Sequence, residues 1–184
     1  MDRDQDQDLL DFFKIIYRLK KEVRKGWLIK AGVKNPESVA DHVCFTALLS
    51  MIIGDMRNLD TFKMVKMALI HDIGEALIGD RVPNEMEGKD RRESEAIFKI
   101  FSHLPNSIHR SYLELWNDLV NCKSEESRLV WELDKFEMAL QACEYFNEGY
   151  DWDKLMEFFT SAERQIKDPF LKTLLVKVKP SPLS

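Results

Sequence analysis

The sequence predicts an all-α fold, and three observations lead to that prediction. Apolar residues recur at helical spacing along most of the 184-residue chain, as in the stripe Leu9, Phe12, Phe13, Ile16 and Leu19. Glycine and proline are sparse, at seven and six residues, so long irregular connections are not expected. No alternation of apolar and polar residues runs long enough to indicate a β-sheet. We therefore expect one helical domain, since this length suits one substantial core.

Polar residues divide the first half of the chain into three expected helices, which run over about 9–23, 36–53 and 60–72. The residues that can cap them are Asp8, then either Asn35 before Pro36 or Ser38 paired with Asp41, and finally Asp60. The second helix is apolar on nearly every side, so we expect it to be buried at the centre of the fold. Between the first two helices, Gly26 and Gly32 enclose an irregular connection.

The second half of the chain predicts a flexible loop over 83–88 and five further helices. The first covers 91–104, with Ile97, Ile100, Phe101 and Leu104 facing inward. The second starts at Asn106 or Ser107. A long third helix follows Ser124 and extends to about Phe146, with acidic residues in its first turn. Asp151 caps a shorter helix, and Pro169 opens the last one.

Composition favours a cytoplasmic protein that acts on small molecules. We expect a single domain over 1–184, with its core over about 9–176 and flexible tails at 1–7 and 177–184. The formal net charge is −5 and no dense basic tract is present, which argues against extended nucleic acid or an anionic membrane as partners. The apolar stretch 43–53 is too short to span a bilayer. The N-terminal residues are polar rather than of secretory type, and the three cysteines form no C-x-x-C pair.

Four ionisable residues lie in or beside stretches that otherwise look like buried helix: His42, His71, Asp72 and Asp134. Burying such groups without a partner costs several kcal/mol, roughly. Taken singly, each has a structural explanation, such as a core histidine bonded to a carbonyl or an aspartate paired with a cation. Taken together, two imidazoles and two carboxylates predict a divalent metal ion, with Mn, Co, Zn, Fe, Ni or Mg as candidates.

The order and surroundings of these residues resemble a known family. His71 follows His42 by 29 residues, and Asp134 follows Asp72 by 62. The local segments are ESVADH (37–42), ALIHDIGE (68–75), GD (79–80) and LDKFEM (133–138). They are similar to the HD-domain metal-dependent phosphohydrolases, in the branch of bacterial 5′-deoxynucleotidase and eukaryotic HD-domain-containing protein 2. The resemblance covers roughly residues 19–145, and it implies a single HD-domain helical bundle.

The resemblance also implies roles for individual residues. His42, His71, Asp72 and Asp134 match the metal ligands. Glu75 and Asp80 match acidic positions that act on the attacking water or the leaving oxygen, or that hold a second metal ion. Arg24 and Trp27 match positions credited with phosphate and sugar contacts. These two are adjacent in the bacterial enzyme but are separated here by Lys25 and Gly26, which puts sugar selection in doubt more than hydrolysis.

The function that follows is removal of the 5′-phosphate from nucleoside monophosphates, with deoxynucleotides favoured, by metal-activated water. Two alternatives stay open at this point. The first is another HD reaction, namely cleavage of a phosphodiester or a triphosphate. The second is a non-catalytic, metal-bound module for ligand sensing or dimerisation, against which Glu75 and Asp80 argue. We also expect a homodimer, mainly from the resemblance and also because the second half carries many large aromatic residues.

Overall fold

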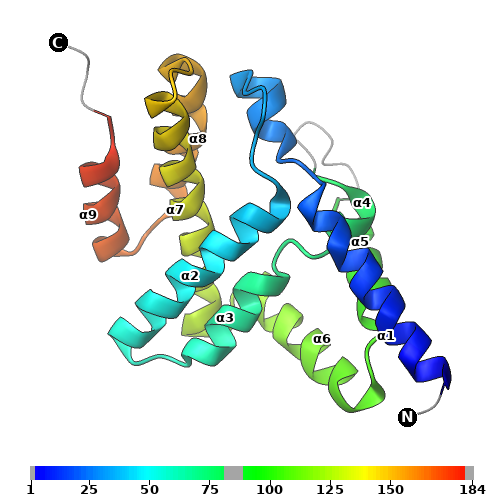
Figure 1. The fold of residues 1–184 in the computed structure, drawn as a ribbon. Coiled ribbons are helices and arrows are strands. Elements are labelled where there is room, and N and C mark those ends of the chain that lie inside the picture. Colours follow the sequence, from blue (N-terminus) through cyan, green and yellow to red (C-terminus); the bar gives the residue numbers. More distant parts are fainter. Residues whose placement is uncertain (1–2, 81–88, 181–184) are drawn as a thin grey trace.

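The computed structural model describes residues 3–80 and 89–180 as an assembly of helices (Figure 1). The α-helices are α1 (Arg3–Ile16), α2 (Val39–Arg57), α3 (Thr61–Ile70), α4 (Glu75–Ile78), α5 (Lys89–Phe101), α6 (Asn106–Val120), α7 (Glu125–Asn147), α8 (Trp152–Gln165) and α9 (Pro169–Val178). Two further turns of helix are η1 (Tyr17–Lys20) and η2 (Trp27–Ala31). Within the described ranges the only β-structure is an isolated bridge between Val23 and Ser38. The all-α prediction is confirmed.

Capping side chains set most of the helix starts that the sequence predicts. Ser38, and not Asn35, caps α2 through a reciprocal pair of hydrogen bonds with Asp41. The side chains of Asp60, Ser124 and Asp151 likewise accept hydrogen bonds at the starts of α3, α7 and α8. The last helix begins at Pro169 as expected, with Asp168 as its cap.

The three helices of the first half differ in their bounds from the prediction. The first helix begins at Arg3 rather than after Asp8, so most of the expected N-terminal tail is helical. It ends at Ile16 and passes into the 3-10 turn η1, and the backbone around residues 22–24 then bonds to residues 37–39 instead of continuing a helix. The second helix extends past Gly54 to Arg57. The third ends at Ile70, and the next residues form tight turns rather than further α-helix.

Three hydrophobic clusters fill the fold, and α2 and α7 contribute to most of them. The largest packs the outer part of α2 against α3, α7, α8 and α9, around Met64, Leu133 and Phe159. The second joins α1, α4, α5 and α6 to the start of α2, and it contains all four residues predicted to face inward on α5 and just after it. The third lies beneath η2, where Trp27 packs near Tyr145 and Leu155. The start of α2 therefore lies where these clusters meet.

Helix α2 is central, as expected, with contacts to α3, α7 and η1, but only one of its faces is buried. One face is buried and carries His42, Thr46 and Ser50, none of which has exposed surface. The opposite face exposes a series of large apolar side chains: Phe45, Leu48, Met51, Ile52 and Met56. Because the helix is apolar on both faces, its pattern could not distinguish which face the rest of the chain covers. By length and composition α2 alone among the described helices could cross a membrane, a test that core helices of soluble proteins also pass.

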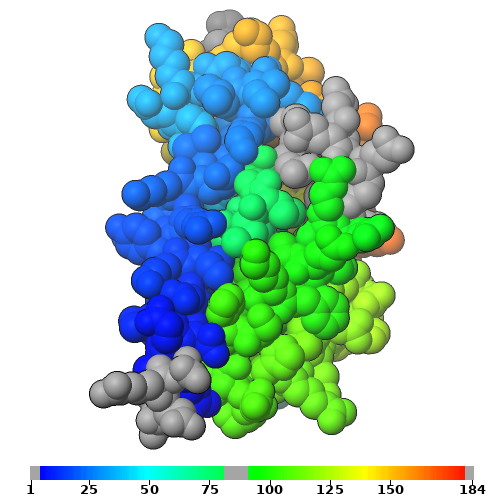
Figure 2. All heavy atoms as spheres, turned by 90° about the vertical axis from the view of Figure 1, so that its right-hand side faces the viewer, coloured from blue at the N-terminus to red at the C-terminus, as the bar shows by residue number. Residues whose placement is uncertain are grey.

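The segment around α4 lies between the N-terminal part of the chain and α5, as the space-filling view in Figure 2 shows. Contacts of α4 with η1, α1 and α5 hold it there. The loop predicted over 83–88, residues 1–2 of the predicted N-terminal tail and residues 181–184 of the predicted C-terminal tail lie outside the described residues.

Candidate metal centre

Helix α2 places His42 in its first turn, on the buried face. The capping pair fixes this start: the Asp41 amide donates to Ser38 Oγ at 3.2 Å, and the Ser38 amide donates to Asp41 Oδ2 at 2.9 Å. One residue later, the side chain of His42 points inward and has no exposed surface. A well-capped helix start therefore holds the imidazole in a fixed direction.

His71 and Asp72 reach the same place from the end of α3. His71 is the C-cap residue of that helix, and its Nδ1 lies 2.7 Å from the carbonyl oxygen of Ala68. Only a protonated Nδ1 can donate to that carbonyl, so in the neutral ring Nε2 carries the lone pair, and Nε2 faces His42 in the interior. The chain then turns through Gly74 into α4, and this turn brings Asp72 alongside.

Asp134 comes from the middle of α7 and is 5% exposed. Its Oδ2 accepts a hydrogen bond from Lys135 Nζ at 2.7 Å, while Oδ1 lies 3.1 Å from His42 Nε2. The long helix therefore contributes a carboxylate whose two oxygens face different partners.

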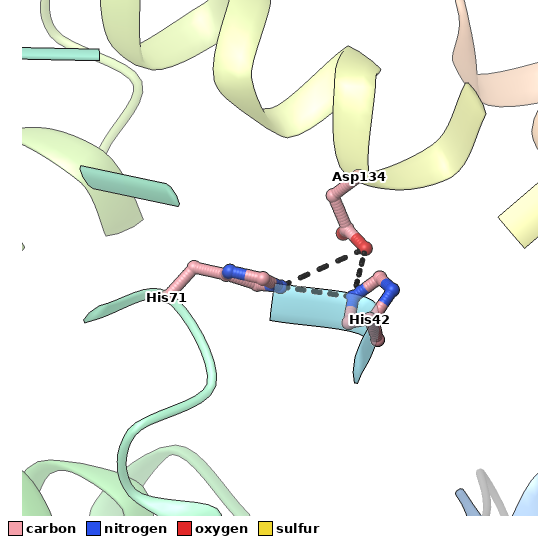
Figure 3. A group of neighbouring side chains, drawn as sticks. All are labelled: His42, His71 and Asp134. Atoms are coloured by element: carbon pink, nitrogen blue, oxygen red, sulfur yellow. Dashed lines mark hydrogen bonds and ion pairs between the residues drawn. The ribbon is translucent and has the colours of Figure 1, made fainter. Parts of the chain in front are cut away.

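The four predicted ligands converge, although they come from three separate segments. Figure 3 shows His42, His71 and Asp134 pointing toward one another. The Nε2 atoms of the two histidines are 3.0 Å apart, and one ligand atom from each of these three residues lies within 4.8 Å of the others. Asp72 Oδ2 lies 3.3 Å from His71 Nε2 and 3.6 Å from His42 Nε2. Two imidazole nitrogens and two carboxylates form a donor set suited to a divalent transition metal, so these residues fit the metal that the sequence predicts.

The electrostatics of the cluster fit a site built for a cation. Burial and Arg24 both disfavour a charged His42, but hydrogen bonds with Asp134 and Glu137 outweigh them and raise its pKa to about 10. Burial opposes ionisation of Asp134 as well, yet Lys135 and the two histidines hold its pKa well below the usual range. The pKa of Asp72 is also lowered, by His71 and Arg24 against burial. Both carboxylates are therefore charged at neutral pH.

Glu75 begins α4 beside this cluster. Its Oε2 is buried and has no hydrogen-bond partner among the described residues. Burial, with the nearby charges of Asp72 and Asp80, raises the pKa of Glu75 to about 9. At neutral pH this carboxyl group therefore holds a proton that it can donate.

Arg24 and Asp80 lie beside the cluster and are connected through the backbone. Arg24 Nη1 donates to Asp72 Oδ2 at 3.0 Å, which brings a guanidinium to the edge of the site. The carboxylate of Asp80 accepts a hydrogen bond from the backbone amide of Lys25, and the Asp80 amide donates to Glu22 Oε1 at 3.0 Å. Asp80 thereby fastens the segment that carries Arg24.

The structure does not bring Trp27 to the surface of the site. Its side chain is 1% exposed, and the ring stacks on Phe158 with a centroid separation of 4.1 Å. Its Nε1 donates to Glu37 Oε1 at 2.9 Å. The predicted contact between Trp27 and the sugar therefore stays a prediction, while the observed contacts of Trp27 are those of a core residue.

Two glutamates beside His42 were missed by the sequence reasoning. Glu137 is 3% exposed, and its Oε2 lies 2.5 Å from His42 Nδ1. Glu37 is partly buried nearby, and burial together with the charge of Glu137 raises its pKa to about 7. A signal was present, because Glu137 follows Asp134 by three residues and so shares its side of α7. Both glutamates also belong to the segments that carry the family resemblance.

Comparison with known proteins places the chain in a family. Residues 16–174 match the HD domain family. A protein of Dictyostelium discoideum named 5′-deoxynucleotidase HDDC2 is 37% identical over 183 residues, which cover 92% of this chain and 96% of that protein. The human protein of the same name is 34% identical over 176 residues, or 94% of this chain and 85% of the relative.

A solved structure gives the same result for the fold. A protein from Pyrococcus horikoshii OT3 superposes with a TM-score of 0.77 at 32% sequence identity, over 92% of this chain and 97% of that one. The match of the family over most of the chain and the identities above 30% agree with the geometry of the His and Asp cluster. The chain belongs to the HD domain family.

Proposed function

We propose that this protein is a divalent-metal-dependent 5′-deoxynucleotidase, which removes the 5′-phosphate from deoxyribonucleoside monophosphates. The observation that carries the proposal is the convergence of His42, His71, Asp72 and Asp134 beside Glu75, whose Oε2 has no hydrogen-bond partner in the described part of the chain. The names of the Dictyostelium and human relatives support the choice of substrate.

The arrangement supplies what hydrolysis of a phosphate monoester needs. A divalent metal held by the four ligands would polarise a phosphoryl oxygen and acidify water. Arg24 would offset the charge of the phosphate, since its guanidinium already lies at the edge of the site. As water attacks phosphorus and the P–O5′ bond breaks, the leaving oxygen needs a proton, and Glu75 holds one. Asp80 would keep the Arg24 segment in place and contribute a carboxylate beside the attacking water.

A phosphate-release screen tests this function. The purified protein would be assayed with Mn²⁺, Co²⁺, Zn²⁺, Ni²⁺, Fe²⁺ or Mg²⁺ against matched deoxyribonucleoside and ribonucleoside monophosphates, a phosphodiester and a nucleoside triphosphate. We expect metal-dependent release of phosphate from monophosphates, faster for the deoxy series. Turnover only of the diester or the triphosphate would contradict the proposal, and so would no turnover with any metal.

We further propose a homodimer that covers the exposed face of α2. Phe45, Leu48, Ile52 and Met56 form a stripe along this helix, and Phe62 and Leu69 of α3 add to the exposed apolar surface. Contiguous apolar patches of this kind commonly mark interfaces. Many aromatic residues of the second half, which prompted the expectation of a dimer, are packed within the chain, but Phe98, Trp131 and Phe170 are exposed.

Light scattering of the wild type and two variants tests the dimer. We expect twice the 21.6 kDa chain mass for the wild type at micromolar concentration and the single-chain mass for Ile52→Lys. Val176→Lys is the matched control, because Val176 is an exposed apolar residue of α9 outside the α2 stripe, and its substitution should leave the mass unchanged. A wild type of single-chain mass would contradict the proposal.

A cytoplasmic location completes the proposal. Cys44, Cys122 and Cys143 are all free, and unpaired cysteines are usual in a reducing compartment.

A further inference from the structure

His42 lies between two groups of side chains rather than at the edge of one. Its Nε2 faces the ligands His71, Asp72 and Asp134, while its Nδ1 faces Glu137 at 2.5 Å. Glu37 belongs to this second group, since one ligand atom each from Glu37, His42 and Glu137 lies within 4.8 Å of the others. The reaction outlined above uses neither glutamate, although both carboxyl groups lie beside a completely buried imidazole.

Helix α7 supplies both a metal ligand and the partner of another ligand. Asp134 and Glu137 are three residues apart, so they lie on the same side of the helix and reach the two nitrogens of one ring. A carboxylate that is 3% exposed needs a hydrogen-bond donor, because leaving it unpaired would cost several kcal/mol, roughly. The Nδ1–H of His42 meets that need.

The two histidine ligands are oriented by different kinds of acceptor. His71 donates from Nδ1 to a neutral backbone carbonyl, that of Ala68, within its own helical turn. His42 donates to a carboxylate that comes from another helix. A charged acceptor at Nδ1 makes Nε2 more electron-rich than a neutral one does, and it also fixes the ring. The support of His42 is therefore the one that depends on packing between α2 and α7.

Glu37 is held from two directions. Trp27 Nε1 donates to its Oε1 at 2.9 Å, and its backbone amide donates to the hydroxyl oxygen of Tyr145 at 2.8 Å. Trp27 is itself wedged between Tyr145 and Phe158. A chain of polar contacts thus runs from the buried indole through Glu37 toward Glu137 and His42.

We propose that Glu137 is a positioning residue for the metal ligand His42, and that Trp27 and Glu37 form its supporting layer. Glu137 selects the tautomer in which Nε2 carries the lone pair and aims it at the metal. Trp27 takes part in this site through its N–H group rather than through contact with substrate. The inference rests on the metal centre of the proposed function but not on the identity of the substrate.

Metal binding to matched variants tests the proposal. Co²⁺ affinity would be measured by competition with a chelator, and the visible spectrum of bound Co²⁺ would report the ligand geometry. We expect Glu137→Gln to weaken affinity by about 10–100-fold and to change the spectrum, as is usual when the partner of a ligating histidine is lost. Glu132→Gln is the control, because Glu132 is on the same helix but accepts hydrogen bonds from the amides of Lys167 and Asp168.

The control separates a specific effect from a general loss of stability. We expect Glu132→Gln to keep the wild-type Co²⁺ affinity and spectrum, whatever it does to the unfolding temperature. A Glu137→Gln protein that folds and binds Co²⁺ as the wild type does would overturn the role of Glu137 while leaving the metal centre intact. A wild type that binds no Co²⁺, Mn²⁺ or Zn²⁺ would overturn both this inference and the proposed function.

A second measurement needs no substitution at Glu137. Nitrogen NMR of histidines in the Zn²⁺-loaded wild type identifies which ring nitrogen of His42 carries hydrogen. We expect a protonated Nδ1 and a metal-bound Nε2, and the opposite arrangement would overturn the proposal even if Glu137→Gln fails to fold. Trp27→Phe, which removes the N–H but keeps an aromatic ring, should weaken Co²⁺ binding by about two- to tenfold, less than the loss of Glu137 itself. An unchanged affinity would remove Trp27 from the supporting layer.

Discussion

The ligand side of the site and its substrate side are built from different kinds of structure. On the ligand side, His42, His71 and Asp134 are anchored at or within α2, α3 and α7, and each has a second hydrogen-bond partner that fixes its direction. On the substrate side, Arg24 lies in the irregular segment between η1 and η2, which is held by hydrogen bonds of Asp80 with Glu22 and Lys25 and by backbone bonds to residues 37–39. The first arrangement gives rigid positions, whereas the second depends on how a connecting segment folds back on the domain.

This difference has a functional consequence. A metal ion needs its donor atoms within tenths of an ångström, and helices with fixed caps provide that. A substrate varies in its base and sugar, so loops on a rigid scaffold commonly carry the residues that contact it. We therefore expect substitutions of ligand-side residues to abolish activity, and substitutions of substrate-side residues to alter activity without abolishing it.

The largest effect should come from His71→Ala. Removing one of two imidazole ligands should lower metal affinity by more than the roughly 10–100-fold that follows from losing a ligand's hydrogen-bond partner, and activity should be lost with it. Metal content and phosphate release would be measured on the same preparation. His103→Ala is the control, since His103 lies near Asp8 on α1, outside the cluster. Full metal content in the His71→Ala protein would contradict the ligand assignment.

Glu75→Gln should have the next largest effect and should separate catalysis from metal binding. Because the pKa of Glu75 is raised to about 9, glutamine resembles its neutral form at pH 7 and the fold should be retained. Glutamine has no proton to transfer, so kcat should fall by about 10²–10⁴-fold at normal metal content. An unchanged kcat would exclude Glu75 from the reaction, and loss of one metal equivalent would favour a second ion held by Glu75 and Asp80.

The ligand side was largely predictable from sequence, for a local reason. Ser38, Asp60 and Ser124 set helix starts through contacts within four residues, and such signals are visible in the sequence itself. The order of the histidines and aspartates then matched a family whose ligands come in that order. Glu137 escaped notice because a charged residue on a long helix is usually solvent-exposed, and only the packing of α7 against α2 shows that it is buried.

The substrate side was less predictable, because its geometry depends on contacts between residues far apart in the chain. Trp27 is buried by Phe158 and Tyr145, and no local sequence pattern predicts either contact. The outward face of α2 is a similar case. An apolar helix pattern predicts that a surface needs covering, but it does not say whether the chain or a partner covers it.

Metal binding on the ligand side of the site should depend on pH. His42 has its pKa raised to about 10 by Asp134 and Glu137, so it is protonated at neutral pH when no metal is bound. A metal ion must displace that proton from Nε2, and raising the pH therefore strengthens binding. We expect affinity to increase by about tenfold per pH unit between pH 6 and 8. Calorimetry in two buffers of different ionisation enthalpy should detect about one proton released, and an affinity independent of pH would contradict this assignment.

The smallest effect concerns sugar selection by Trp27. If the indole contacted the sugar at the 2′ position, its loss would lower the ratio of kcat/KM for deoxyribonucleotides to kcat/KM for ribonucleotides by about tenfold to a hundredfold. The indole is 1% exposed and stacked on Phe158, so Trp27→Phe should change the ratio of the two kcat/KM values by less than about twofold. Arg24→Ala is the comparison: it should lower both values together, because its guanidinium lies at the edge of the site and a phosphate is common to both substrates. A tenfold lower ratio of the two kcat/KM values in Trp27→Phe, at unchanged stability, would contradict this expectation and indicate that the indole contacts the sugar.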